Sequence, residues 1–273
     1  MTRRTLIGAA LGAAGAGLAY PTLLEPRWLE VTHKNVPFPA GIRIAHLTDL
    51  HYSWAVPLSL IEDAIALALA AKPDLICITG DFVTHGKDFD APAYTRLFQK
   101  LTARVPVYAS LGNHDGGKWG ANHRGLPTHQ TVDRILEEGG VTLLHNRAVR
   151  LEGNRGSFHL AGVGDYWAQE VDGEQALRGI PAGSPTVLLS HNPDSKEVLQ
   201  QHRWDLMLSG HTHGGQVIVP FRGPIYAPVK DFGYVAGLNP FLDRMIHTSR
   251  GVGSLGSVRF RCRPEVSILD LRT

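Results

Sequence analysis

The stretch GIRIAHLTDLHYSWAVPLSLIEDAIALALAAKPDLICITGD, residues 41–81, contains one complete strand–helix–strand unit. Its first part reads as a strand that ends near Thr48. A helix follows, with Pro57 near its start and Pro73 beyond its end, and DLICITGD is a second, buried strand. A unit of this kind closes as a right-handed crossover, which places its two strands parallel in one sheet.

The alternation of strands and helices continues along the chain. Helical patterns cover residues 91–104 and 131–140, and a third strand covers residues 105–115. After Val141 the pattern changes to short strands, with one clear helix over residues 193–202. The expected strands there are VTLLHNRAVRLE, SFHLAGVGD, TVLLSH, WDLMLSGH, QVIVP and EVSILDL. They predict a second sheet packed against the first, in one composite domain of the α/β class.

Composition and charge describe an ordinary globular protein. Of the 273 residues, 43% are hydrophobic and 19% charged, and the formal net charge is +2. No Lys/Arg block follows the first few residues, so no nucleic-acid partner is expected. The cysteines, Cys77 and Cys262, form no Cys-x-x-Cys pair. Two inert thiols are the favoured interpretation, with a disulfide between them as the alternative.

The first residues have the pattern of an export signal. Arg3 and Arg4 precede an uncharged, Ala- and Gly-rich segment, residues 5–20, with a candidate cleavage position after Ala19. This pattern resembles a twin-arginine signal. The segment is short for a membrane span, which needs about 20 strongly apolar residues.

We therefore assign residues 1–25 to a signal or N-terminal anchor and residues 26–273 to the folded domain. The assignment implies the twin-arginine export machinery as a partner. It also implies a location in the periplasm or on the outer face of the inner membrane, with membrane association if the segment is retained. The alternative is the frayed terminus of a cytoplasmic protein.

Polar side chains that bind metals gather where the apolar strands end, at the edge of the sheet where sites form in open α/β folds. The seven candidate ligands are Asp49, His51, Asp81, Asn113, His191, His211 and His213, and His114 and Asp115 follow Asn113 directly. Each alone is also typical of a turn or a helix cap. Together, carboxylate, amide and imidazole groups without a thiolate suit manganese, iron or zinc. The set is too large for one ion and predicts two, about 3.5–4 Å apart, which suits phosphoester hydrolysis.

The motifs DLH, GD, GNHD, SH and GHTHGGQ, in this order, resemble the signature of the calcineurin-like metallophosphoesterase family. TDLHYS, HNPDSKEV, WDLMLSGHTHGGQ and SRGVGSLGSVRFRCRPEV resemble its YaeI/YkuE-type exported phosphodiesterase branch. The resemblance implies a four-layer α/β/β/α sandwich of two mixed sheets flanked by helices. It also implies two ligand sets that share Asp81: Asp49, His51, Asp81 and His213 for one ion, and Asp81, Asn113, His191 and His211 for the other.

Further residues follow from the same resemblance or lie beside the site. His114 is expected to face the scissile group, where it stabilises the transition state or protonates the leaving oxygen. Asp115 is expected either to orient His114 or to cap a turn. Arg250 is expected either to bind phosphate oxygens or to form a structural ion pair. His46 lies close enough to support the site, and Trp167, in GVGDYWAQ, is expected to pack or to line the groove.

The function expected from these residues is a dinuclear metal-dependent phosphodiesterase that hydrolyses a phosphoester by attack of a metal-bridging hydroxide. The alternative is a diphosphatase that acts on a nucleotide-linked or lipid-linked sugar such as UDP-diacylglucosamine. A non-catalytic binding scaffold is a weaker alternative, because the ligand set is complete.

Overall fold

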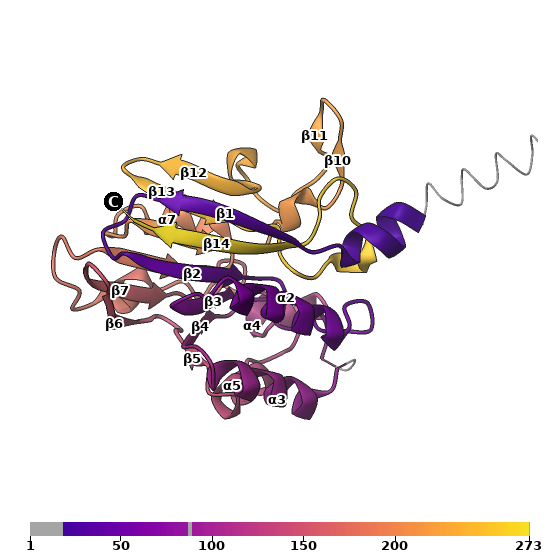
Figure 1. Ribbon diagram of the computed structural model, residues 1–273, viewed down its shortest axis with the longest axis horizontal. Coiled ribbons are helices and arrows are strands. Elements are labelled where there is room, and N and C mark those ends of the chain that lie inside the picture. Colours follow the sequence, from indigo (N-terminus) through magenta and orange to yellow (C-terminus); the bar gives the residue numbers. More distant parts are fainter. Residues whose placement is uncertain (1–18, 87–88, 273) are drawn as a thin grey trace, which may run out of the picture.

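Two six-stranded sheets, stacked face to face, form the centre of the protein in the computed structural model, which describes residues 19–86 and 89–272 (Figure 1). The first sheet has the spatial order β1 (Glu30–Val36), β14 (Glu265–Leu271), β2 (Ile42–Leu47), β3 (Leu75–Thr79), β4 (Val107–Ser110) and β5 (Thr142–Leu143). The second has the order β12 (Gly237–Phe241), β13 (Arg244–Thr248), β9 (Leu206–Ser209), β8 (Thr186–Leu189), β7 (Gly156–Gly162) and β6 (Arg147–Gly153). Strands β10 (Ile218–Val219) and β11 (Gly223–Pro224) form a separate hairpin.

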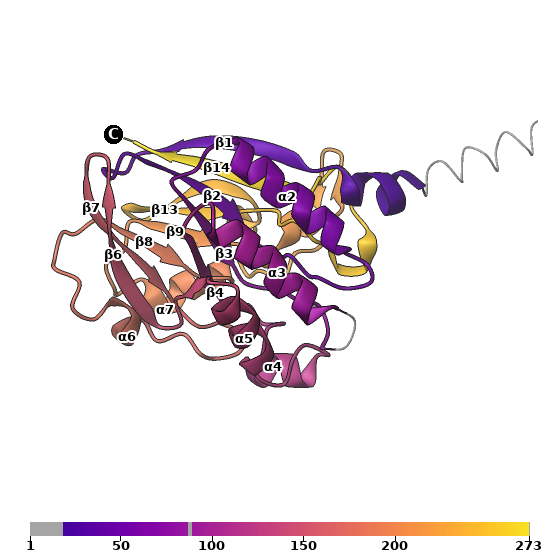
Figure 2. The same ribbon diagram turned by 60° about the horizontal axis from the view of Figure 1, so that its bottom comes forward.

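Helices cover the outer faces of the two sheets. On the first sheet these are α2 (Leu58–Ala70), α3 (Ala91–Thr102) and α5 (Gln130–Glu138), as Figure 2 shows. The short helices α6 (Gly173–Leu177) and α7 (Lys196–Leu199) contribute to the apolar core outside the second sheet, and α4 (Gly117–Asn122) follows β4. Both sheets mix parallel and antiparallel pairs. The expected sandwich of two mixed sheets flanked by helices is confirmed.

The apolar core lies in three layers, which explains why the central strands are apolar on both faces. In β3, Ile76 and Ile78 pack towards the helices, whereas Cys77 faces the second sheet. In β9, Leu208 faces the first sheet and Met207 faces the outer helices. Because side chains alternate along a strand, each sheet joins two cores at once.

The strand–helix pattern before Val141 is confirmed, but some of the later segments do not lie wholly in the second sheet. VTLLHNRAVRLE forms two strands, β5, which pairs with β4 in the first sheet, and β6, which lies in the second. EVSILDL forms β14, which lies in the first sheet, parallel to β1 and antiparallel to β2. All seven residues of β14 are buried, so its sequence fits the middle of either sheet equally well. Its neighbour β1 was not predicted, because EVTHKNV is polar and partly exposed.

Two further elements are shorter than expected. The helix predicted over residues 193–202 consists of a turn at Pro193–Ser195 and α7, Lys196–Leu199. Of QVIVP, only Ile218–Val219 pair as a strand.

The N-terminal segment packs onto the domain from Tyr20 onwards. The backbone N–H of Arg259 donates to the carbonyl of Pro21, at 2.8 Å. The backbone N–H of Cys262 donates to the buried carboxylate of Glu25. Residues 20–25 therefore contact the folded domain near its C-terminal end. The twin-arginine pair and the rest of residues 1–18 lie outside the described residues.

The described residues also bear on a membrane span. Within residues 19–86 and 89–272, no helix has both the length and the apolar character required to cross a membrane.

Candidate metal centre

The loops after β2, β3 and β9 turn sharply and bring the candidate ligands together. Their φ angles are 52° at Asp49, 48° at His51, 53° at Asp81, 68° at His211 and 51° at His213. Residues other than glycine rarely adopt this left-handed conformation, and where they do it is concentrated at functional sites. Backbone hydrogen bonds hold the first two loops in place, from the N–H of Asp49 to Gly80 at 3.0 Å and from the N–H of His51 to Asp81 at 2.9 Å.

Gly210 allows the loop after β9 to pass directly against the loop after β2. A methyl group on its Cα would overlap Thr48 Oγ1 and Asp49 Oδ2. The next residue, His211, donates its backbone N–H to both carboxylate oxygens of Asp49, at 3.2 and 3.0 Å. Glycine is therefore required at position 210, because the loops after β2 and β9 approach each other too closely for any larger residue.

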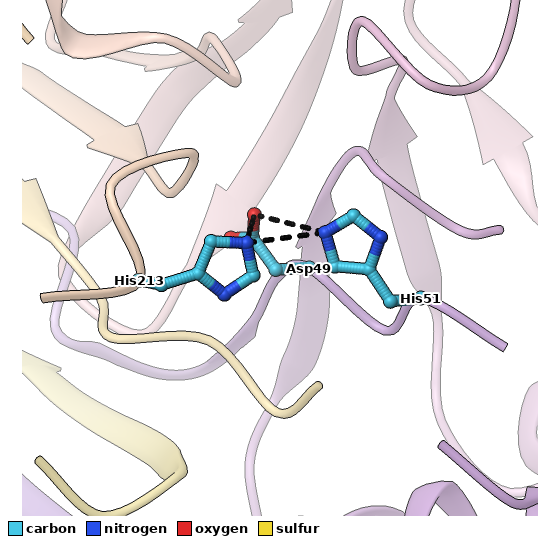
Figure 3. A group of neighbouring side chains, drawn as sticks. All are labelled: Asp49, His51 and His213. Atoms are coloured by element: carbon cyan, nitrogen blue, oxygen red, sulfur yellow. Dashed lines mark hydrogen bonds and ion pairs between the residues drawn. The ribbon is translucent and has the colours of Figure 1, made fainter. Parts of the chain in front are cut away.

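One ligand group consists of Asp49, His51 and His213, which point toward one another in Figure 3. His213 Nε2 lies 3.1 Å from His51 Nε2 and 3.3 Å from Asp49 Oδ1. All three side chains are buried. Asp81 borders this group, because its Oδ2 lies 3.4 Å from His51 Nε2.

The other group consists of Asp81, His191 and His211. His191 Nε2 lies 3.2 Å from Asp81 Oδ2 and 3.2 Å from His211 Nδ1. Asn113 lines a cleft together with Asp81 and His211, and its buried Oδ1 has no hydrogen-bond partner among the described residues. The same oxygen of Asp81 thus faces both groups, as expected of a bridging carboxylate.

These residues fit two divalent ions. Ligand nitrogens about 2.1 Å from one tetrahedral ion lie roughly 3.4 Å from each other, close to the separations seen here. Burial lowers the pKa of His51 to about 3 and the pKa of His213 to about 3, so both rings are neutral at neutral pH. Burial opposes ionisation of Asp81, but the charge of His191 outweighs it and holds the pKa of Asp81 well below its usual value. His51 and His213 are therefore already in the neutral form that a metal requires. Burial opposes the charge of His191, but Asp81 outweighs burial and holds the pKa of His191 well above its usual value, so a metal bound there would displace a proton from this ring.

Neighbouring groups orient the ligand rings. His191 Nδ1 lies 2.7 Å from the carbonyl of Thr79, and His51 Nδ1 lies 3.2 Å from Thr84 Oγ1. Such contacts leave the other ring nitrogen free to bind a metal. The expected support from His46 is also present, because its Nε2 lies 2.8 Å from Thr79 Oγ1.

His114 lies in the cleft beside the ligands. Its Nδ1 is 2.9 Å from the carbonyl of Thr84, and its backbone N–H donates to Asp81 Oδ1 at 2.9 Å. A carbonyl only accepts, so Nδ1 carries the proton and Nε2 is left for the cleft. The cleft has a volume of about 270 Å³, and Trp119 and Trp167 form part of its wall.

Among the described residues, the hydrogen bonds of the Asp115 carboxylate go to backbone N–H groups rather than to the His114 ring. Its Oδ1 accepts the backbone N–H of Phe82 at 2.7 Å, and its Oδ2 accepts that of Gly112 at 2.8 Å. The carboxylate therefore braces the loops after β3 and β4, which is the turn-capping alternative. The carbonyl of Thr84 orients His114 instead.

Arg250 is not among the described residues that line the cleft. Its Nε donates to Glu265 and its Nη2 to Glu30, each at 2.8 Å. The ion-pair alternative for Arg250 is confirmed.

The two cysteines do not form a disulfide. Cys77 and Cys262 are free, buried thiols, as the favoured interpretation expected.

Arg259 supports the site and was missed in the sequence. Its buried guanidinium donates to the carbonyls of His213, Arg250, Gly251, Gly253 and Cys262. Gly251 and Gly253 pack against Asp49, so Arg259 holds the backbone behind one ligand group. Arginine alternates along SVRFRCR, and this local pattern gives no sign of which one is buried.

Two sheets with paired metal-ligand groups at their strand ends define a metal-dependent phosphoesterase. The profile of the calcineurin-like phosphoesterase family matches residues 42–215, and the chain belongs to this family. It is therefore a metal-dependent phosphoric ester hydrolase, as the resemblance implied.

Individual relatives cover almost the whole chain. Phosphodiesterase YaeI of Escherichia coli is 43% identical, with 96% of each chain covered. The uncharacterized metallophosphoesterase YkuE of Bacillus subtilis is 30% identical over 100% of this chain and 98% of YkuE. UDP-2,3-diacylglucosamine pyrophosphatase LpxG of Chlamydia trachomatis is 27% identical, with 90% of each chain covered.

Proposed function

We propose that this chain is a phosphodiesterase whose substrate carries an apolar or aromatic group. The cleft at the metal ligands supports this most directly. Among the described residues, its lining contains Trp119, Trp167, Tyr226 and Leu255 but no Lys or Arg. A phosphodiester carries one negative charge and two organic groups, whereas a monoester dianion presents more charge for cations to neutralise.

A neighbouring cleft extends the aromatic wall. Its volume is about 620 Å³, and its lining includes Trp119, Tyr166, Trp167 and Val198. The two tryptophans, whose rings are 5.4 Å apart, belong to both clefts. The second organic group of a diester has room there.

When bound, a pair of divalent ions supplies Lewis-acid stabilisation of the phosphoryl oxygens and acidifies water. Asp49, His51, Asp81 and His213 would hold one ion, and Asp81, Asn113, His191 and His211 the other. As the imidazolium, His114 keeps one proton on Nδ1, facing the Thr84 carbonyl, and donates the other from Nε2 to the leaving oxygen. Thr84 keeps the ring in the orientation that this transfer requires.

A substrate comparison tests the proposal. The metal-loaded chain is given bis(4-nitrophenyl) phosphate and 4-nitrophenyl phosphate, with the His114→Asn variant as background. We expect kcat/KM for the diester to be about tenfold higher or more, because the aromatic walls contact its second group. A preference for the monoester would reject the diesterase assignment.

Hydrolysis of the diphosphate in a lipid-linked nucleotide sugar is the second candidate. The apolar wall and the similarity to LpxG favour it. A lipid-linked UDP-sugar added to the same comparison separates the two candidates, because a diphosphatase would prefer it over the aryl diester.

We propose that the two ions are manganese, iron or zinc, because the ligand atoms are nitrogen and oxygen, without a thiolate sulfur. Elemental analysis of the chain as isolated, followed by reconstitution with each metal after chelation, identifies the ions that restore activity. Restoration by magnesium alone would contradict this choice.

We also propose that residues 1–25 direct export by the twin-arginine machinery and associate the chain with the membrane. Arg3 and Arg4 carry this proposal. Replacing both with lysine should retain the protein in the cytoplasm, whereas the wild-type chain fractionates with the periplasm or the inner membrane. Unchanged fractionation would reject it.

A further inference from the structure

The β10–β11 hairpin belongs to a face of the domain that exposes large apolar side chains. The exposed members are Leu23, Leu24, Trp28, Trp54, Phe221, Ile225, Tyr226 and Leu255, and we call this surface the hairpin face. Phe221 is fully exposed at the hairpin turn. Exposed apolar side chains gathered in this way mark an interaction site.

Direct contacts join the segments of the hairpin face. The N–H of Ile218 donates to the carbonyl of Phe260 at 2.9 Å, and the ring of Phe260 packs edge-to-face on Tyr20. Gln216 donates its side-chain amide to the carbonyl of Leu255. Figures 1 and 2 both place the hairpin and the N-terminal helical turns at the same end of the molecule. The face is therefore continuous, although its segments are distant in sequence.

The charge of the hairpin face has one sign. Residues 20–29, 52–57, 217–228 and 255–263 contain five arginines, of which Arg259 is buried, and a single acidic residue, Glu25. Glu25 is buried, whereas Arg27, Arg222 and Arg261 are exposed. Two copies of this face would bring like charges together, which disfavours self-association. Aromatic and aliphatic side chains interleaved with arginine instead match an anionic lipid surface.

The metal cleft opens at the edge of the hairpin face. Tyr226 and Leu255 belong to the face and also line the cleft beside His213. A surface that covers the hairpin face would therefore lie next to the cleft mouth.

The start of the described chain also lies at this face. Tyr20 packs on Phe260, and the sequence before it contains an uncharged run from Thr5 onwards. Attachment of that run to a membrane would hold the hairpin face against the same membrane. The position of the N-terminal segment therefore favours a bilayer over a protein as the partner of this face.

We infer that the hairpin face docks on an anionic phospholipid bilayer, with Phe221 and Ile225 inserted at the boundary between headgroups and acyl chains. Arg27, Arg222 and Arg261 contact the lipid phosphates. The metal cleft then opens toward the membrane surface. This extends the proposed membrane association from the N-terminal segment to the folded domain, and it does not depend on hydrolysis.

Vesicle flotation of the full chain tests the inference. The vesicles are phosphatidylcholine, with and without phosphatidylglycerol. The test variant is Phe221→Ser with Ile225→Ser, and the matched control is Leu242→Ser. Leu242 is also exposed, but it lies in the β12–β13 turn at the opposite end of the molecule in Figure 1.

We expect the double variant to lower the partition coefficient for phosphatidylglycerol vesicles about tenfold or more, because two apolar side chains no longer insert. Arg222→Glu should weaken binding to these vesicles and leave binding to phosphatidylcholine alone nearly unchanged. The control should bind as the wild type does. All variants should hydrolyse bis(4-nitrophenyl) phosphate at the wild-type rate, since none of the changed residues lines the cleft.

Equal flotation of the double variant and the wild type would overturn the inference, because the N-terminal segment alone would then bind. So would the absence of wild-type binding to phosphatidylglycerol vesicles. A concentration-dependent dimer that the double variant abolishes, without vesicle binding, would identify a self-association face and reject it as well. Loss of diester hydrolysis with vesicle binding intact would count only against the proposed function.

Discussion

The Nε2 atoms of His51 and His213 lie 3.1 Å apart, although 162 positions separate the two residues in the chain. Asp49 Oδ1 lies 3.3 Å from His213 Nε2 and completes the group. The two imidazoles are buried and neutral, and their Nε2 atoms face the same point. A cation bound at that point would satisfy both nitrogens at once.

His213→Ala should therefore remove one metal ion. We expect the bound metal to fall from about two equivalents per chain to about one, with the second group intact. Elemental analysis of purified protein measures this, and His33→Ala, an exposed histidine of β1, is the control. Unchanged metal content in His213→Ala would show that this group is not a ligand set.

His114→Asn should separate chemistry from metal binding. His114 lies close to His51 and Asp81, but its Nδ1 contacts Thr84 and it belongs to neither of the two predicted ligand sets. Its loss should therefore leave metal content near two per chain and lower kcat by about 100-fold or more. Steady-state hydrolysis of an aryl diester gives the rate. The control is His123→Asn, an exposed imidazole that stacks on the same Trp119 and should keep near-wild-type activity. Equal rates for wild type and His114→Asn would remove His114 from the mechanism.

Asp115→Asn should affect stability more than catalysis. Its two oxygens accept the N–H groups of Phe82 and Gly112, and an amide can satisfy only one of them. The lost hydrogen bond and the facing donors should cost about 1–3 kcal/mol of folding free energy. Urea unfolding measures this cost, and activity of metal-loaded protein should stay within about threefold of wild type. A rate loss as large as that of His114→Asn, with stability unchanged, would restore a role in orienting His114.

Glu265 should make stability depend on pH. Burial opposes its ionisation, but Arg250 outweighs burial and lowers the pKa of Glu265 from 4.5 to about 2. A carboxylate with a lowered folded-state pKa stabilises the protein above its unfolded pKa, and this stability is lost as the pH falls from 4.5 toward 2. The shift corresponds to about 3 kcal/mol.

The free energy of unfolding of wild type minus that of Glu265→Gln, measured in urea from neutral to acidic pH, isolates this contribution. The difference should be positive at neutral pH and should shrink below about pH 4.5. A difference that stays constant across that range would show that Glu265 titrates normally in the folded protein.

Sequence patterns alone were sufficient to predict which loops at the strand ends hold the candidate ligands. Apolar runs of strand length, each closed by Asp, His or Asn, located the loops after β2, β3, β4, β8 and β9, because a residue's polarity and its position in a run are local properties. The structure brings Asp49, His51 and His213 together in one group and Asp81, His191 and His211 in another, and it also places His114 beside His51 and Asp81.

Local pattern was insufficient where partners come from elsewhere in the chain. EVSILDL is apolar enough for either sheet, and only its pairing with β1 and β2 places it in the first. Asp115 and Arg250 each had two plausible roles, and the side chains packed around them decided between the two.

The sequence by itself therefore determined the ligand types, their order and the family to which the chain belongs. Only the tertiary structure decided that Thr84 rather than Asp115 orients His114, that Glu265 and Glu30 occupy Arg250, and that buried Arg259 supports the backbone behind His213. The physical reason is that hydrogen bonds and ion pairs form between whichever groups folding brings within about 3 Å, and that proximity depends on the packing of the whole chain.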